Sequence, residues 1–435
     1  MMKRILSLLA ALTLMLPAEL MVKTARADEL PYGLPELDIT SDVVTYLTWD
    51  SQKSMEKDAA NLLMQEVYGC KIKVVRTTFT EITSKATNLT LSNSSTDLIK
   101  FRDQDVLTFI NNGLVEDMTP YQDLYAGLEY EANAHAQNGK IYAMPINKIY
   151  NNNYIFYWTS FFDDQGLETP WELYQQGDWT FSTMRELMKD LTIDEDRDGI
   201  IDTYALVLHP IYSYLISGED FVSYDAETGL YSNNLRSPKL AEYFEFLYNT
   251  GTAGDNTRLM SQQDINCFAA KNAVMMLGQQ WTMGSEYYED IVEGRMGIAP
   301  TPRMDSTDTN YVRGRVDYFW VGKNASNING ALAYLACCRV IEENKELANE
   351  LKARMGGTVI DWPDEIQEVI DEMNDTEKFK MLLPVYSSVG TWGDDTYGFW
   401  DLSAQITEWE VPWQTIVEQR YPLLQDSINQ VNNAQ

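Results

Sequence analysis

The stretch of residues 139–162 constrains the fold more than any other part of this sequence. It reads GKIYAMPINKIYNNNYIFYWTSFF, in which residues 140–146 predict a short strand stopped by Pro145 and residues 154–162 an aromatic run with strand and then helix character. Strands and helices that could complete one lobe precede it, and a different kind of segment follows. We expect the chain to cross here to a second lobe, which would place the aromatic run at an interlobe cleft. The alternative is a buried strand pair inside one large domain.

The first 27 residues have the pattern of a secretion signal. Lys3 and Arg4 precede an apolar run too short to span a bilayer, and Ala25-Arg26-Ala27 offers small residues at a cleavage site. The first cysteine, Cys70, lies far beyond that site, so we expect an exported protein, periplasmic or extracellular, with no lipoprotein cysteine. The remainder of the 435 residues exceeds what one hydrophobic core usually organises, which favours two lobes.

The chain is strongly acidic, with 65 Asp and Glu against 33 Lys and Arg and a formal net charge of −32. Such a surface repels phosphate backbones, so we expect no nucleic-acid partner. The four cysteines include the adjacent pair Cys337-Cys338 and show no CxxC spacing, which favours buried thiols over a disulfide scaffold or a zinc site. A bridge to Cys70 stays open in an oxidising compartment.

Strands and helices alternate after the signal. Residues 42–49, 70–77 and 96–101 have strand character, and helical spacing lies between and after them. This order predicts an α/β lobe with a mostly parallel sheet. Such sheets bind ligands beyond the carboxyl ends of their strands. The candidate ligand-binding residues there are Trp49, Phe101, Arg102, Asp103, Gln104 and Asp105.

Aromatic and amide side chains gather again after the crossing. An apolar strand at residues 273–277 leads into Gln280-Trp281, where the indole could stack on a sugar ring and the amide could bond its hydroxyls. The alternative is that Trp281 packs beneath a helix. Residues 312–321 predict one further aromatic strand, and Ser182 a helix N-cap. The candidate ligand-binding residues of this half are Trp158, His209, Tyr212, Gln280, Trp281, Tyr318, Trp392 and Trp400.

One short acidic motif resembles a calcium loop. Carboxylates at loop positions 1, 3, 5 and 9 and a glycine at position 6 match the spacing of EF-hand loops, in which position 7 ligates through its carbonyl oxygen. Position 12 is Ala205, so the usual bidentate Glu is missing. The motif is either a structural Ca²⁺ site completed from elsewhere or an acidic turn without metal. Its candidate ligands are Asp194, Asp196, Asp198, Ile200 and Asp202.

Catalytic motifs are missing from the sequence. The two histidines, His135 and His209, have no GxSxG elbow to partner them, and HExxH, GxxxxGK[ST] and GxGxxG do not occur. Paired carboxylates for glycoside hydrolysis stay possible, because spacing in sequence does not give spacing in space. We expect a binding protein without an organic cofactor. The alternative is a secreted, calcium-dependent glycan-active enzyme, a lyase or hydrolase.

Several blocks occur in an order that resembles extracellular solute-binding protein family 1, the substrate-binding components of ABC importers. Residues 96–99, Gly113-Leu114 and residues 117–120 are similar to its PD-I-I…sGLL-D-tP block, and residues 139–145 to its GKIYG-P block. Ile155-Phe156-Tyr157 is similar to the L-Y-N strand, with Trp158 in place of Asn. Residues 268–276 with Gln280-Trp281 are similar to F--GKAAM…GPW, and residues 297–302 to G-APLP.

This resemblance implies a two-lobed, type II periplasmic-binding-protein fold that closes on its ligand about a hinge. It implies a signal at 1–27, an N-terminal lobe of 28–146 plus 299–355, and a C-terminal lobe of 147–298 plus 356–435. The implied ligand is a carbohydrate, an oligosaccharide in the interlobe cleft, and the implied partners of this expected monomer are ABC permease subunits in the membrane. Phe101, Gln104 and Asp105 stand where maltodextrin binders carry an aromatic, an acid and a base, and Trp281 where they carry a stacking indole.

Overall fold

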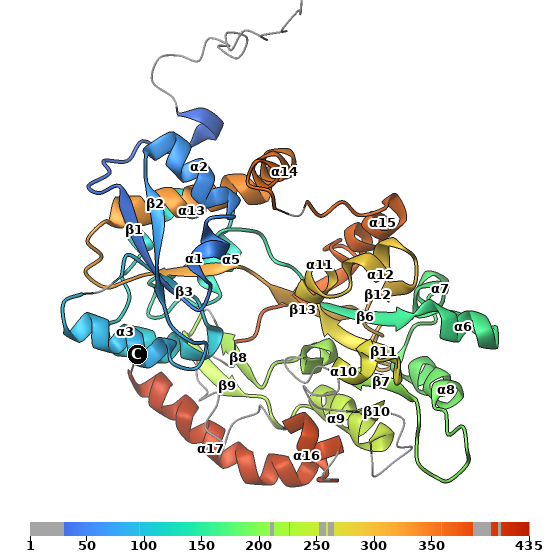
Figure 1. Cartoon of the computed structure of the whole chain (residues 1–435). Coiled ribbons are helices and arrows are strands. Elements are labelled where there is room, and N and C mark those ends of the chain that lie inside the picture. The colour runs from blue at the N-terminus through green and yellow to red at the C-terminus, as the bar shows by residue number, and fades with distance from the viewer. Residues whose placement is uncertain are drawn as a thin grey trace, which may run out of the picture.

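The computed structural model describes residues 30–94, 96–208, 213–225, 227–251, 258–259, 265–357, 359–385, 402–407 and 410–434. They form two α/β lobes joined by a small sheet, as expected (Figure 1). The predicted signal at 1–27 lies outside the described residues and stays a prediction. None of the helices within the described ranges is both long and apolar enough to cross a bilayer.

The first lobe is built on a five-stranded sheet with the order β2-β1-β3-β14-β4. β1 pairs in parallel with β2 and β3, whereas β14 runs antiparallel to both β3 and β4, so the sheet is mixed: β14 runs opposite to the other four strands. The strand β14 enters between β3 and β4 from much later in the chain. The strands are β1 (Val43–Thr48), β2 (Lys71–Arg76), β3 (Leu98–Lys100), β4 (Ala143–Pro145) and β14 (Tyr318–Val321).

Helices cover both faces of this sheet because its strands are apolar on both sides. Val44 and Tyr46 of β1 pack in one hydrophobic cluster with α2 and α13, and Leu47 packs on the other face with α3 and α4. The helices of this lobe are α1 (Gln52–Met55), α2 (Ala59–Tyr68), α3 (Ile82–Leu91), α4 (Val106–Asn111), α5 (Glu129–Asn133), α13 (Ile328–Glu343) and α14 (Lys345–Arg354), with 3-10 turns at Pro31–Gly33, Asp103–Asp105 and Thr119–Tyr125.

The second lobe has its own five-stranded sheet with the order β10-β7-β11-β6-β12. Its strands are β6 (Asn153–Trp158), β7 (Tyr204–Leu208), β10 (Arg258–Leu259), β11 (Ala273–Gln279) and β12 (Met296–Ala299), and a hairpin of β8 (Val222–Asp225) and β9 (Leu230–Asn233) lies beside it. Its helices are α6 (Thr159–Gln165), α7 (Pro170–Gln176), α8 (Phe181–Leu191), α9 (Pro238–Thr250), α10 (Ile265–Ala269), α11 (Trp281–Ser285), α12 (Tyr288–Val292), α15 (Asp364–Met373), α16 (Leu402–Thr407) and α17 (Trp413–Ala434), with a 3-10 turn at Ser213–Ser217.

Two local predictions in this region were wrong. The N-cap of α8 is Thr180, whose side chain accepts from the backbone N–H of Thr183, while the hydroxyl of Ser182 donates to Asp305 at 2.8 Å. The single strand predicted at residues 312–321 is divided into β13 and β14, which belong to different sheets. The break between them matters for the site, because its residues face a cavity.

A three-stranded sheet connects the lobes. It has the order β15-β13-β5 and contains β5 (Tyr150–Asn151), β13 (Asn310–Arg315) and β15 (Phe379–Leu382). β5 lies between β4 and β6 in the chain and β13 between β12 and β14, so both are on passages from one lobe to the other, and β15 pairs with β13. Ala299 and Met304 still pack in the core of the second lobe, and Val321 packs in that of the first. The predicted lobe boundaries themselves stay predictions.

Asp97 ties three distant segments of the first lobe together. It is buried just before β3, and its Oδ2 accepts hydrogen bonds from the backbone N–H of Thr45 at 2.8 Å and from its hydroxyl at 2.6 Å. Its Oδ1 accepts from the backbone N–H of Asn327 at 2.7 Å and from the hydroxyl of Ser326 at 3.2 Å. Asn327 in turn caps α13 by accepting from the N–H of Gly330. One carboxylate therefore joins β1, β3 and the start of α13.

We expect Asp97→Asn to lower the free energy of unfolding by about 2–4 kcal/mol, because the new amide nitrogen faces donors that need an acceptor. Chemical denaturation checks this. Asp164→Asn, the same change at an exposed aspartate of α6, is the matched control and should stay within about 0.5 kcal/mol of the unaltered chain. Equal effects of the two substitutions would contradict the role given to Asp97.

Candidate functional site

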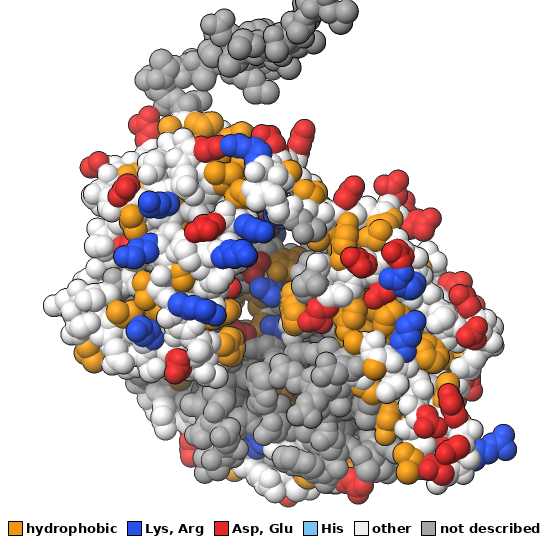
Figure 2. Space-filling model, viewed as in Figure 1, with side chains coloured by type: hydrophobic (Ala, Val, Ile, Leu, Met, Phe, Trp, Pro, Cys, Tyr) orange, Lys and Arg blue, Asp and Glu red, His pale blue; other side chains and the backbone are white. Residues whose placement is uncertain are grey.

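A cavity of about 680 Å³ lies where the strands of the first sheet end, next to the sheet that connects the lobes. The space-filling view shows the surface hollowed between the lobes, with basic side chains inside the hollow (Figure 2). The walls come from the ends of β1 and β3 and from the break between β13 and β14. This is the edge at which ligands of open α/β sheets bind. Its lining includes Trp49, Asp50, Phe101, His135, Arg315 and Tyr318.

The end of β1 supplies an indole and an ion pair. Trp49 meets the ring of Phe79 edge-on with centroids 5.1 Å apart, and the ammonium group of Lys100 lies 4.8 Å above the indole. Lys100 also pairs with the carboxylate of Asp50 at 2.5 Å. A cation over an aromatic ring is attracted by the ring quadrupole. The contacts with Phe79 and Lys100 therefore hold Trp49 in place in the wall.

Some residues of the segment after β3 line the cavity, and others hold those residues in position. Phe101, Arg102 and Asp103 line the cavity, and the Phe101 ring lies 4.9 Å from that of Tyr318. Arg102 forms a two-point ion pair with Asp105, with 2.6 Å from Nη2 to Oδ1, and donates to the carbonyl of Phe79. Asp105 is buried and does not line the cavity, so it orients Arg102. The side chain of Gln104 is not among those described.

Of the candidates predicted after the crossing, Tyr318 lines the cavity beside Phe101, whereas the other described ones do not. Trp158, expected to face the cleft, is 3% exposed in the core, where its indole N–H donates to the carbonyl of Phe268 at 2.9 Å. It therefore cannot offer a ring face to a ligand. Gln280 directly precedes α11, and Trp281 begins it and is 42% exposed; neither lines the cavity. His209, Tyr212, Trp392 and Trp400 lie outside the described residues.

Sequence reasoning missed several residues of the cavity wall. His135 carries no motif, and Arg315 and Asp317 were hidden inside a strand that the structure divides. Arg315 donates through Nε and Nη2 to Asp317 at 3.1 and 2.8 Å, and the Tyr150 hydroxyl of β5 donates to the same carboxylate at 3.1 Å. This network couples the wall of the cavity to the strands that join the lobes.

A hydrogen bond between two buried side chains joins the two lobes directly. The side-chain amide of Gln137 in the first lobe donates to the hydroxyl of Tyr231 on β9 at 2.8 Å, and both side chains are buried. The backbone of Tyr231 is held on both sides by the amide of Asn432, near the end of α17. The last helix of the chain thus supports the hairpin that touches the first lobe.

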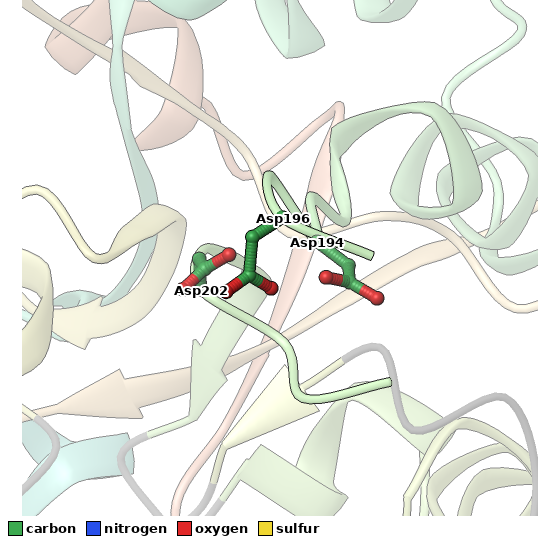
Figure 3. A group of neighbouring side chains, drawn as sticks. All are labelled: Asp194, Asp196 and Asp202. Atoms are coloured by element: carbon green, nitrogen blue, oxygen red, sulfur yellow. The ribbon is translucent and has the colours of Figure 1, made fainter. Parts of the chain in front are cut away.

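The acidic motif forms an exposed loop between α8 and β7, on the side of the second lobe away from the first (Figure 1). Asp194, Asp196 and Asp202 each place a carboxylate oxygen within 4.8 Å of the others. Figure 3 shows the carboxylate of Asp196 between the other two. Asp198 is not part of this group and accepts from the N–H of Ile200 at 2.7 Å, while the side chain of Ile200 is 67% exposed. Three carboxylates at this spacing suit a hard cation with oxygen ligands.

Burial lowers the pKa of His135 to about 4, and the carboxylate of Asp103 opposes this shift in part. An unfolded histidine has a pKa near 6.5. Between about pH 6.5 and pH 4 His135 is therefore protonated in the unfolded chain but neutral in the folded chain. The neutral ring therefore costs stability as the pH falls through this window and costs nothing above it.

We expect the free energy of unfolding of the unaltered chain to fall more between pH 6.5 and 4 than that of His135→Phe, by on the order of 3 kcal/mol. Chemical denaturation of both proteins at half-unit steps of pH checks this. The carboxylates common to both proteins cancel in the difference. Parallel pH profiles would contradict the shift in His135.

The comparisons with known proteins agree with this geometry. Residues 59–354 match the model of the family described as bacterial extracellular solute-binding protein. No curated protein matches the chain. Similar solved structures cover about nine tenths of this chain and nearly all of their own.

One is a cyclo/maltodextrin-binding protein complexed with maltotetraose, with a TM-score of 0.63, 12% identity, and coverage of 90% of this chain and 99% of that one. Another is an ABC substrate-binding protein from Listeria monocytogenes in complex with cycloalternan, with a TM-score of 0.61, 14% identity, and coverage of 90% and 98%. A third is a maltose/maltodextrin-binding domain from Bdellovibrio bacteriovorus bound to maltotriose, with a TM-score of 0.59, 16% identity, and coverage of 89% and 99%.

These likenesses agree with the two-lobed fold and with the family resemblance seen in the sequence blocks. The family match spans well over half of the chain, including the passages between the lobes that contain β5 and β13. The chain therefore belongs to the family of bacterial extracellular solute-binding proteins.

Proposed function

We propose that this chain is the substrate-binding component of an ABC importer and that it binds a carbohydrate, an oligosaccharide, in the cavity between its lobes. The observation that carries the proposal is the wall of rings and paired charges made by Trp49, Phe101 and Tyr318 with Lys100 and Asp50. The family match and the sugars bound by similarly folded proteins support it.

The wall suits an uncharged polyol for two reasons. Aromatic faces pack well against the C–H faces of sugar rings, and Trp49 and Phe101 both reach the cavity. The ion pairs Lys100 with Asp50 and Arg315 with Asp317 offer both donors and acceptors to hydroxyl groups. A neutral sugar can use both members of a pair, whereas a charged ligand would have to compete with one of them.

The proposal includes binding without turnover, in an exported monomer that delivers its ligand to membrane permease subunits. The family description supports an extracellular place, and the N-terminal pattern of the sequence supports export through a cleaved signal. No organic cofactor is part of the proposal. Incubation of the purified protein with each sugar, followed by product analysis, tests for turnover.

We expect calorimetry to find at least one ligand in a panel of maltose, maltotriose, maltotetraose, cycloalternan, cello-oligosaccharides and xylo-oligosaccharides. Phe101→Ala should weaken that ligand's binding by about 10- to 100-fold, since it removes a ring face from the cavity. Phe161→Ala, at an equally half-buried ring of α6 away from the cavity, should leave the affinity unchanged. Binding of spermidine or a peptide, with no sugar bound, would contradict the carbohydrate proposal.

We also propose that the acidic loop binds a structural Ca²⁺ through Asp194, Asp196 and Asp202, with Asp198 and the Ile200 carbonyl as further candidates. The three grouped carboxylates repel one another without a cation, which supports this assignment. The loop is exposed and lies in the second lobe, so the ion would stabilise that lobe and take no part in ligand binding.

We expect EDTA to lower the thermal midpoint of the unaltered protein by a few degrees, since removing a bound ion removes its stabilisation of the folded state. Asp196→Asn should respond much less to EDTA, whereas Asp190→Asn, at an exposed aspartate of α8, should respond like the unaltered protein. Sugar affinity should stay the same with and without EDTA. A melt that EDTA does not change would contradict the Ca²⁺ proposal.

A further inference from the structure

His135 sits in the wall of the cavity between two aromatic rings. It follows α5 and is 3% exposed. Its ring centroid lies 5.0 Å from that of Phe101, tilted by 46°, and 5.0 Å from that of Tyr318, nearly edge-on at 77°. Two ring contacts of this kind fix the plane of the imidazole. The cavity reaches His135 as well as both rings.

The imidazole carries polar atoms, whereas the faces of the two rings that contact it are apolar. Its Nδ1 is buried and has no hydrogen-bond partner among the described residues. A buried polar atom left unpaired costs about 1–3 kcal/mol. Because burial holds its pKa near 4, the ring is neutral at ordinary pH and offers one donor and one acceptor.

The two neighbouring rings cannot offer this hydrogen-bonding capacity to a ligand. Phe101 has no polar side-chain atom, and the hydroxyl of Tyr318 already donates to the carbonyl of Glu131 at 2.8 Å. Tyr318 therefore presents its ring to the cavity, and His135 is the member of this trio with hydrogen-bonding capacity to spare. A buried polar group without a hydrogen-bond partner calls for an explanation in a folded protein, and a role in binding is one such explanation.

We propose that His135 is a specificity-determining residue of the sugar site: its imidazole hydrogen-bonds one hydroxyl of a sugar ring whose apolar face lies on Phe101. This inference rests on the proposed carbohydrate function. It adds a polar contact that the family resemblance of the sequence did not indicate. A site built to hydrogen-bond a hydroxyl group binds the sugar that carries this hydroxyl more tightly than an analogue that lacks it. The contact therefore makes the site selective between sugars.

Two histidines in the whole chain make a direct test possible. The full-length protein, labelled with ¹⁵N at histidine, gives two imidazole spin systems, and the one that disappears in His135→Phe belongs to His135. We expect the His135 nitrogen resonances to shift when the protein is saturated with the tightest-binding sugar of the panel above. An unmoved His135 resonance at saturation overturns the proposal.

Variants separate binding from packing. We expect His135→Phe to weaken the binding of that sugar by about 10-fold. The thermal midpoint of the unliganded protein should stay the same or rise, because a ring of similar size replaces an unpaired polar group. His135→Gln should recover part of the affinity, since its amide again offers a donor and an acceptor. Unchanged affinity in His135→Phe overturns the inference while leaving the carbohydrate function standing. Failure of the unaltered protein to bind any sugar of the panel overturns both.

Discussion

The first lobe depends on one buried carboxylate. Asp97 accepts hydrogen bonds from Thr45 of β1, 52 residues earlier in the chain, and from Asn327 before α13, 230 residues later. A charge in such a place is costly to bury unless its oxygens are satisfied, and here each oxygen accepts two hydrogen bonds. The edge of the sheet that carries Trp49 and Phe101 is positioned by the strands that Asp97 holds together.

The cavity belongs partly to the first lobe and partly to the connection between lobes. Trp49 and Phe101 follow strands of the first sheet, whereas Arg315 ends β13 of the connecting sheet and pairs with Asp317 just before β14. Tyr150 of β5 shares that carboxylate. Arg315 therefore links the wall of the cavity directly to the connecting sheet. This arrangement gives a physical route by which ligand contact can favour one angle between the lobes over another.

The sequence predicted the repeating parts of the fold well, because strand and helix periodicity follows from which faces are buried. It placed β1, β2 and β3, and it put Trp49 and Phe101 at the edge of the sheet where the structure has a cavity. Its predictions failed where contacts between distant parts of the chain decide what surrounds a side chain. Trp158 has the same local pattern whether it faces a ligand or the core, and its burial depends on distant residues such as Phe268, which contacts its indole. His135 stands outside any periodic element, and its role depends on rings from β14 and from the residue after β3.

The insertion of β14 between β3 and β4 has a consequence for how the protein is made. A ribosome finishes β4 at residue 145, but the strand that must separate it from β3 ends at residue 321. At about 5–20 residues per second, this gap lasts roughly 10 to 35 s. During that time the emerging amino-terminal half lacks a central strand of its sheet and cannot reach its final form, so the first lobe can complete its sheet only after most of the chain has been made.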